Sequence, residues 1–114
     1  MARHAIGSGD IVWVDFEPAY GHEQGGRRPA LVLSVSEYNE RSSFVLVCPI
    51  TTSRRQWGFN LPLTDCTKVE GSVIVDQIRS IDKRRIASQI VERLSPEGLE
   101  EIRGKLAALI GIAL

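Results

Sequence analysis

The chain has 114 residues, and 43% of them are hydrophobic, which suits one compact domain with its own core. Its 14 basic and 14 acidic residues cancel, so no overall electrostatic field draws the protein to nucleic acid or membrane, and any polyanion site must be local. The longest apolar run, LAALIGIAL, is far shorter than the roughly 20 residues of a membrane-spanning helix, and the N-terminal residues lack the apolar core of a signal peptide. We therefore expect a cytoplasmic protein with no membrane partner.

Apolar alternation in the first half of the chain predicts three consecutive antiparallel strands. Residues 10–17 (DIVWVDFE) alternate as a half-buried strand does. The face expected to be buried carries Val12, Val14 and Phe16. Residues 29–35 (PALVLSV) and 43–50 (SFVLVCPI) are β-branched or leucine-rich runs of strand length, and a polar turn at residues 36–42 separates them.

The second half predicts shorter strands and then one helix. Residues 51–63 form a polar loop that leads into a fourth strand, and Pro62 places that strand at a sheet edge or at its own end. Residues 71–81 (GSVIVDQIRSI) predict a fifth strand. Residues 84–94 (RRIASQIVERL) are compatible with one or two short strands or with a helical turn.

The C-terminal segment predicts an amphipathic helix over residues 96–112. Ser95 can cap it, and Pro96 suits the first helical position. The apolar residues that recur at helical spacing are Leu99, Ile102, Leu106, Leu109 and Ile110. Many short strands followed by one such helix predict a small, strongly bent antiparallel sheet or barrel with the helix packed on it.

The glycine-rich stretch GHEQGGRRP, residues 21–29, is the first candidate for chemistry. The loop between Phe16 and Pro29 is much longer than a hairpin needs, and such loops are usually functional or disordered. Pro29 biases Arg28 into an extended backbone conformation, at the mouth of the second strand. Glu23 lies on the loop itself. A solvated loop with charges for solubility would explain any one of these residues alone.

A second polar cluster, PITTSRR, follows the third strand. Thr51 and Thr52 lie at the strand end, and Arg54 and Arg55 come directly after them. A carboxylate, a fixed guanidinium and a hydroxyl from neighbouring strand ends can surround one phosphate, and the planar arginine fork suits phosphate oxygens. Trp57 either stacks on a nucleobase or packs within the protein.

The spacing of possible metal ligands indicates no metal and no cofactor. The two histidines lie far apart, with no H-E-x-x-H pattern, and no G-x-x-x-x-G-K-[ST] loop is present. Cys48 lies in the apolar run FVLVCPI and Cys66 in the polar stretch TDCTK, unlike a C-x-x-C pair or a disulfide framework. We assign a structural role to Cys48 and none to Cys66.

Four segments in this order, GDIVWVDFEP, GHEQGGRRPALVLS, VCPITT and GSVIVDQIRSID, resemble the MazF/PemK-type toxins of bacterial type II toxin–antitoxin systems. The resemblance covers nearly the whole chain. Its most specific parts are EQGGRRP at Glu23 to Pro29, PIT at Pro49 to Thr51, and the pair Asp76 and Gln77. It implies a mainly β fold with a C-terminal α-helix, an SH3-like small antiparallel barrel of the PemK/CcdB toxin type. Residues 1–114 would then form a single toxin domain that works as a homodimer.

The resemblance also implies an activity and partners. Such toxins are mRNA interferases, metal-independent and sequence-selective endoribonucleases that cut single-stranded RNA and thereby arrest growth. The substrate's own 2′-hydroxyl attacks the adjacent phosphorus and leaves 2′,3′-cyclic phosphate and 5′-hydroxyl ends. A cognate antitoxin blocks the site with a disordered C-terminal tail that lies across the toxin dimer.

By position, Arg28 and Thr51 match the family's main catalytic pair, and Glu23 matches a glutamate implicated in some members. We assign Glu23 as the base, Arg28 as the charge stabiliser and a candidate proton donor, and Thr51 as the hydroxyl that positions the phosphate. In one branch a loop histidine and an Arg-x-Asp before the Gln share the work; here His22 and Asp76 match, but Ile74 replaces the arginine. The base is therefore Glu23, His22 or Asp76.

The residues expected to contact RNA flank this site. They are Arg27, Gln24, Arg54, Arg55, Trp57, His22, Asp76 and Gln77. The alternative is a non-catalytic toxin of the same fold that acts by binding, such as a CcdB-like gyrase poison, and a further alternative is an inactive scaffold. A gyrase poison needs neither E-x-x-x-x-R nor P-x-T, and the chain ends in IGIAL without the terminal tryptophan of that toxin, so we favour the ribonuclease.

Overall fold

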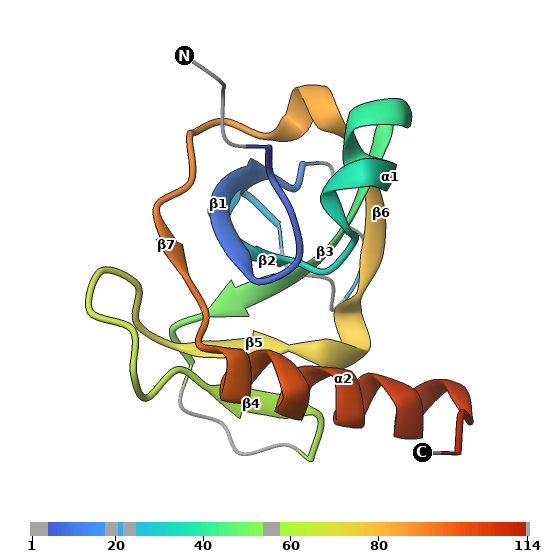
Figure 1. Cartoon of the computed structure of the whole chain (residues 1–114). Helices are drawn as coiled ribbons and strands as arrows, with labels where there is room; N and C mark the ends of the chain where they lie inside the picture. Colours follow the sequence, from blue (N-terminus) through green and yellow to red (C-terminus); the bar gives the residue numbers. More distant parts are fainter. Residues whose placement is uncertain (1–4, 18–20, 22–24, 54–57, 114) are drawn as a thin grey trace.

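The computed structural model describes residues 5–17, 21, 25–53 and 58–113. Figure 1 shows how its strands and helices are arranged. In chain order they are β1 (Asp10–Asp15), β2 (Arg27–Val32), α1 (Ser36–Arg41), β3 (Phe44–Thr51), β4 (Asn60–Pro62), β5 (Ser72–Ile74), the 3₁₀ turn η1 (Val75–Gln77), β6 (Arg79–Asp82), the 3₁₀ turn η2 (Lys83–Arg85), β7 (Glu92–Arg93) and α2 (Pro96–Ile110).

The described strands pair antiparallel in the order β4-β5-β3-β2-β1-β7, and β6 also pairs with β3. The long strand β3 pairs through its first half with β6 and through its last two residues with β5. After β6 the chain returns to β1, where Ile86 bridges Val14 and β7 pairs with Asp10 and Ile11. The sheet therefore curls into a half-barrel with α2 beneath it, which confirms the expected fold class (Figure 1).

The curled sheet buries apolar side chains on both faces. Its inner face holds one cluster that includes Val12, Val14 and Phe16, each with no exposed surface, as the alternation predicted. The outer face packs a second cluster against α2, with Ile11 and Ile102 at 0% exposure. Strand β1 is thus buried on both faces along part of its length, because the sheet curls around one cluster and the helix covers the other.

Helix α2 begins as its capping residues predict. The Ser95 Oγ accepts the Gly98 backbone N–H at 3.0 Å, and Pro96 occupies the first turn. The expected end at residue 112 is wrong, because Gly111 takes a left-handed conformation with φ 79° and ends the helix at Ile110. The last turn extends past the sheet (Figure 1), so Leu109 and Ile110 stay exposed instead of reaching the core.

Two further elements differ from the sequence prediction. The polar turn expected at residues 36–42 is the short helix α1, whose buried Asn39 donates to the Ile6 and Ser34 carbonyls at 2.8 and 3.0 Å. The fifth strand expected at residues 71–81 is interrupted by η1, because β5 and β6 pair with different halves of β3.

The structure also shows how residues 84–94 fold and where the strand of Pro62 lies. Residues 84–94 contain both a turn, η2, and one short strand, β7. The strand of Pro62, β4, lies at the end of the strand order, as its proline predicted. No described helix is long and apolar enough to cross a membrane.

Candidate active site

Arg28 and Thr51 lie at neighbouring strand ends and face the same side of the sheet. Strands β2 and β3 pair with Val32 opposite Val47 and Ala30 opposite Pro49, and Arg28 and Thr51 each lie two residues beyond that last pair on its strand. Because side chains alternate along a strand, both residues continue the row that begins with the buried inner-face valines. The apolar row is therefore continued by a guanidinium on β2 and a hydroxyl on β3.

Arg28 is held by its neighbours on β1 and in the preceding loop. It pairs with Val14 of β1, is half-buried, and donates from Nε to the Gly25 carbonyl at 2.9 Å. Gly26 follows with φ 74°, a left-handed conformation that favours glycine, and its carbonyl accepts the Phe16 N–H at 2.9 Å. These contacts fix the described end of the loop that precedes Arg28.

Thr51 is buried to 8% exposure, at the last position of β3. Its Oγ1 accepts the Ser53 N–H at 3.2 Å, and its backbone pairs with Ser72 of β5. Gly71 lies against its carbonyl so closely that an added Cβ would be 2.1 Å from the Thr51 oxygen, and Gly71 has φ 126°. Sequence reasoning missed Gly71, because nothing in the loop sequence shows that residue 71 meets residue 51.

Asp76 and Gln77 lie on η1, which follows β5. Since β5 and β2 flank β3 on opposite sides, these two residues approach the strand of Thr51 from the side opposite to Arg28. Asp76 is exposed, and burial, assisted by the Asp76 charge, raises the pKa of the Cys48 thiol to about 12. Cys48 is fully buried in the outer-face cluster, which agrees with a structural role.

Arg27 is exposed and pairs with Asp15, so its side chain lies on the sheet face opposite to that of Arg28. Six other residues predicted for the site lie outside the part of the chain that the structure describes. They are His22, Glu23, Gln24, Arg54, Arg55 and Trp57. Among the described residues, no three His, Cys, Asp or Glu side chains converge in a way that could hold a metal ion.

Comparisons with known proteins show the family to which the chain belongs. Residues 8–110 match the sequence model of a family described as the PemK-like, MazF-like toxin of type II toxin–antitoxin systems. The chain is 36% identical over 111 residues to the endoribonuclease toxin MazF of Escherichia coli (strain K12), which covers 97% of this chain and 99% of that protein. It is 42% identical over 108 residues to the endoribonuclease toxin ChpB of the same strain, a match that covers 90% of this chain and 91% of that protein.

Solved structures show the same fold. The crystal structure of MazF from Deinococcus radiodurans superposes with a TM-score of 0.88 at 38% identity, covering 96% of this chain and all of that one. A MazE-MazF crystal structure from the same organism superposes with a TM-score of 0.82 at 33% identity, and the match covers 97% of this chain and all of that one.

Proposed function

Because the chain belongs to the PemK-like, MazF-like toxins of type II toxin–antitoxin systems, we propose that Arg28 and Thr51 form the catalytic centre of an endoribonuclease toxin. The observation that carries the proposal is that both side chains continue the inner apolar row, each two residues beyond the last pair of β2 and β3. A fixed cation and a hydroxyl from neighbouring strand ends are suited to one phosphate of a bound chain.

The substrate is single-stranded RNA, chiefly messenger RNA, in a sequence-selective reaction that arrests growth. The 2′-oxygen attacks the adjacent phosphorus while a base takes its proton, the bond from phosphorus to the 5′-oxygen breaks, and a proton goes to that leaving oxygen. The products carry a 2′,3′-cyclic phosphate and a 5′-hydroxyl. DNA lacks the attacking hydroxyl and is therefore not cut.

Arg28 stabilises the negative charge that grows on the phosphoryl oxygens. Its hydrogen bond to the Gly25 carbonyl orients the guanidinium before substrate arrives, so little reorganisation is needed during the reaction. Losing one such preorganised donor typically costs about 10²- to 10³-fold in kcat. The high pKa of arginine makes charge stabilisation a better role for it than proton donation.

Thr51 positions the phosphate through its hydroxyl, and Glu23 acts as the base, with His22 and Asp76 as the competing candidates. Arg27, Gln24, Arg54, Arg55, Trp57 and Gln77 are proposed to contact the RNA on either side of the cut. A pH profile of kcat in Glu23→Gln, His22→Gln and Asp76→Asn separates the three candidate bases. Only the substitution that replaces the true base abolishes the fall in kcat at low pH.

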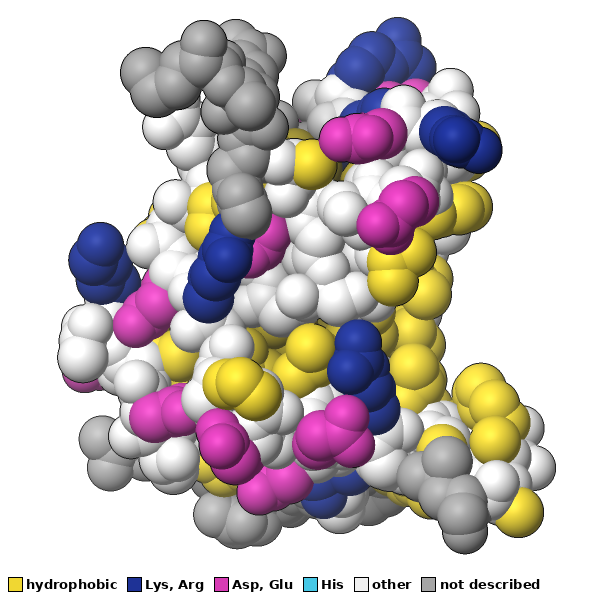
Figure 2. Space-filling model, in the orientation of Figure 1, with side chains coloured by type: hydrophobic (Ala, Val, Ile, Leu, Met, Phe, Trp, Pro, Cys, Tyr) yellow, Lys and Arg dark blue, Asp and Glu magenta, His cyan; other side chains and the backbone are white. Residues whose placement is uncertain are grey.

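The toxin is proposed to act in the cytoplasm as a homodimer, blocked by a cognate antitoxin whose disordered C-terminal tail lies across the dimer. A MazE-MazF complex is among the similar solved structures. Figure 2 shows hydrophobic side chains along the right edge of the molecule, from α1 and β6 to the C-terminal end of α2. The exposed large apolar residues of α1, the start of β3 and the end of α2 are Tyr38, Phe44, Leu109, Ile110 and Ile112, and a second copy would shield such a surface from water.

The test of the catalytic pair uses purified Arg28→Ala and Thr51→Ala with a defined single-stranded RNA. Each variant is expected to lose about 10²-fold or more in cleavage rate while its melting temperature and dimer mass stay near those of the parent. Arg103→Ala removes the same charge from the exposed face of α2, where Arg103 pairs weakly with Glu100 at 3.5 Å, and should cut normally. Full activity of either site variant contradicts the proposal.

A further inference from the structure

A half-buried arginine, Arg85, reaches from η2 to the point where β1 ends. Its Nη1 donates to the Asp15 carbonyl at 3.4 Å and also to the Glu17 carbonyl. The chain around it is fixed beside β1, because Ile86 bridges Val14 and the Ala87 N–H donates to the Trp13 carbonyl at 2.8 Å. One guanidinium therefore binds both carbonyls that flank Phe16, where the strand gives way to the long loop.

Phe16, the residue between these two carbonyls, is held by a second arginine. The Arg79 guanidinium lies over the Phe16 ring, 5.4 Å from its centroid, and Phe16 is fully buried. The Phe16 N–H donates to the Gly26 carbonyl at 2.9 Å, which joins the outgoing end of the loop to its returning end. Two arginines from neighbouring segments thus hold one end of this loop.

The returning end of the loop is joined directly to the catalytic centre. Asp15 pairs with Arg27 and Val14 pairs with Arg28, so the end of β1 sets the position of the start of β2. The Arg28 Nε then donates to Gly25, next to the glycine that binds Phe16. A shift of the Asp15–Glu17 backbone would therefore move the guanidinium of Arg28.

We propose that Arg85 is a positioning residue of the active site, which fixes the β1 end of the loop between β1 and β2 and, through the hydrogen bond from Phe16 to Gly26, the orientation of Arg28. The inference rests on the proposed function of Arg28. Carbonyls at the end of a strand need partners, and the N–H groups of the single Arg85 Nη1 supply both of them. Arg79 supports the same segment through Phe16.

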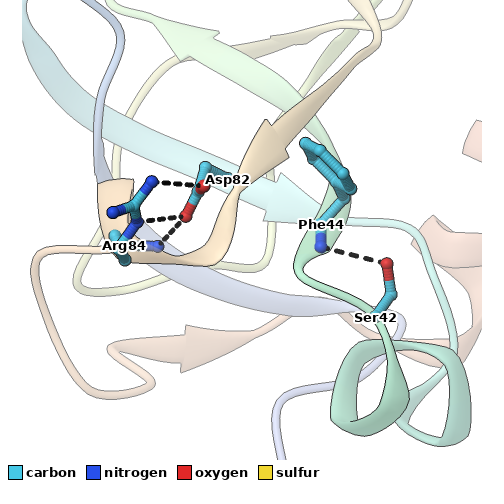
Figure 3. Close-up of polar contacts among 4 residues, drawn as sticks. All are labelled: Ser42, Phe44, Asp82 and Arg84. Atoms are coloured by element: carbon cyan, nitrogen blue, oxygen red, sulfur yellow. Dashed lines mark hydrogen bonds and ion pairs between the residues drawn. The ribbon is translucent and has the colours of Figure 1, made fainter.

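The adjacent Arg84 is a natural matched control. It carries the same charge one residue away, but its side chain is 90% exposed. Figure 3 shows it folded back on Asp82, to which it donates through its backbone N–H at 2.8 Å and its guanidinium at 3.0 Å. These contacts lie within its own turn. Removing Arg84 therefore changes the charge of this face without removing the contacts to Asp15 and Glu17.

The experiment compares Arg85→Ala, Arg85→Lys and Arg84→Ala in steady-state cleavage of a fluorogenic RNA. Arg85→Ala is expected to lose about 10- to 100-fold in kcat with little change in KM, because a misplaced catalytic group slows chemistry more than binding. Arg84→Ala should keep both constants within about 2-fold, and Arg85→Lys should lie between the two. Hydrogen exchange at the Phe16 amide should accelerate in Arg85→Ala but not in Arg84→Ala.

Several outcomes overturn the proposal. Equal losses in Arg85→Ala and Arg84→Ala would mean that only charge matters, and a raised KM with normal kcat would make Arg85 a contact to RNA phosphate. If Arg85→Ala does not fold, Arg85→Met decides, because it keeps the apolar stem but has no donor, so parental kcat in that variant contradicts a need for the two hydrogen bonds. A parent protein that cuts no RNA counts against the proposed function alone, and the exchange measurement then still tests whether Arg85 holds the loop.

Discussion

Gly71→Ala should damage both the stability and the activity of the protein. An alanine Cβ at this position would stand 2.1 Å from the Thr51 carbonyl oxygen and 2.9 Å from its carbon. Ordinary contact therefore requires the β5 and β3 backbones to separate by roughly 1 Å, beside a candidate catalytic residue. The φ of 126° at Gly71 adds to the difficulty, because residues with a Cβ rarely adopt it.

The expected magnitude follows from these two effects. Strained backbone costs about 1 to 3 kcal/mol, and over-packing costs a further ~1 to 3 kcal/mol, so the free energy of unfolding should fall by roughly 2 to 6 kcal/mol. In a chain of this size, that is a drop of about 10 to 20 °C or more in melting temperature. A displacement of ~1 Å at Thr51 should reduce cleavage by about 10²-fold in the fraction that folds.

Urea unfolding and RNA cleavage of the same preparation measure both effects. Gly104→Ala is the matched control, because an added Cβ at this helical position meets nothing within 4 Å, and alanine should stabilise α2 by about 0.5 to 1 kcal/mol. If Gly71→Ala unfolds within about 0.5 kcal/mol of the parent and cuts RNA normally, the close approach at Thr51 is not a constraint, and the reasoning fails.

Three further predictions concern stability and reactivity. The Glu92 carboxylate accepts the backbone N–H groups of residues 67–69 at 2.7 to 3.2 Å, and these hydrogen bonds lower its pKa in the folded protein. The resulting stabilisation is full above the unfolded pKa of about 4.3 and is lost as pH falls through the lower folded pKa. The urea midpoint of Glu92→Gln should therefore depend less on pH than the midpoint of the parent across this range. Buried Cys48, with its pKa raised to about 12, should resist iodoacetamide at pH 8 while half-exposed Cys66 reacts, and equal labelling by mass spectrometry contradicts this. Ser95→Ala should cost about 1 kcal/mol in urea unfolding, and an unchanged midpoint would show that the cap is dispensable.

Elements marked by a pattern within a few consecutive residues could be predicted from the sequence. The alternation in residues 10–17 identified β1 and its buried inner face, and Ser95 with Pro96 marked the start of α2. The break at η1 was missed, because the apolar pattern of residues 71–81 continues through it. What divides that segment is pairing with two halves of β3, a tertiary event that a short window of sequence does not contain.

Some residues of the candidate site could be predicted from the sequence, and others could not. Arg28 and Thr51 could be predicted to lie at neighbouring strand ends, because Arg28 comes at the start of one strand and Thr51 at the end of the antiparallel strand beside it. Gly71 and Arg85 could not be predicted, since their importance depends on partners about 20 and 70 residues away in the chain. The residues that shape this site therefore include some that lie far along the chain from the catalytic candidates they support.

The most direct test of the central claim is cleavage by the purified, antitoxin-free protein in EDTA, with a long single-stranded RNA and its DNA counterpart. The RNA ends are mapped by sequencing, and their chemistry is determined by kinase and phosphatase treatment. The account predicts cuts at a recurring short motif, with 5′-hydroxyl and 2′,3′-cyclic phosphate ends and intact DNA. Intact RNA from a demonstrably folded protein, or fragments with 5′-phosphate ends, would contradict it.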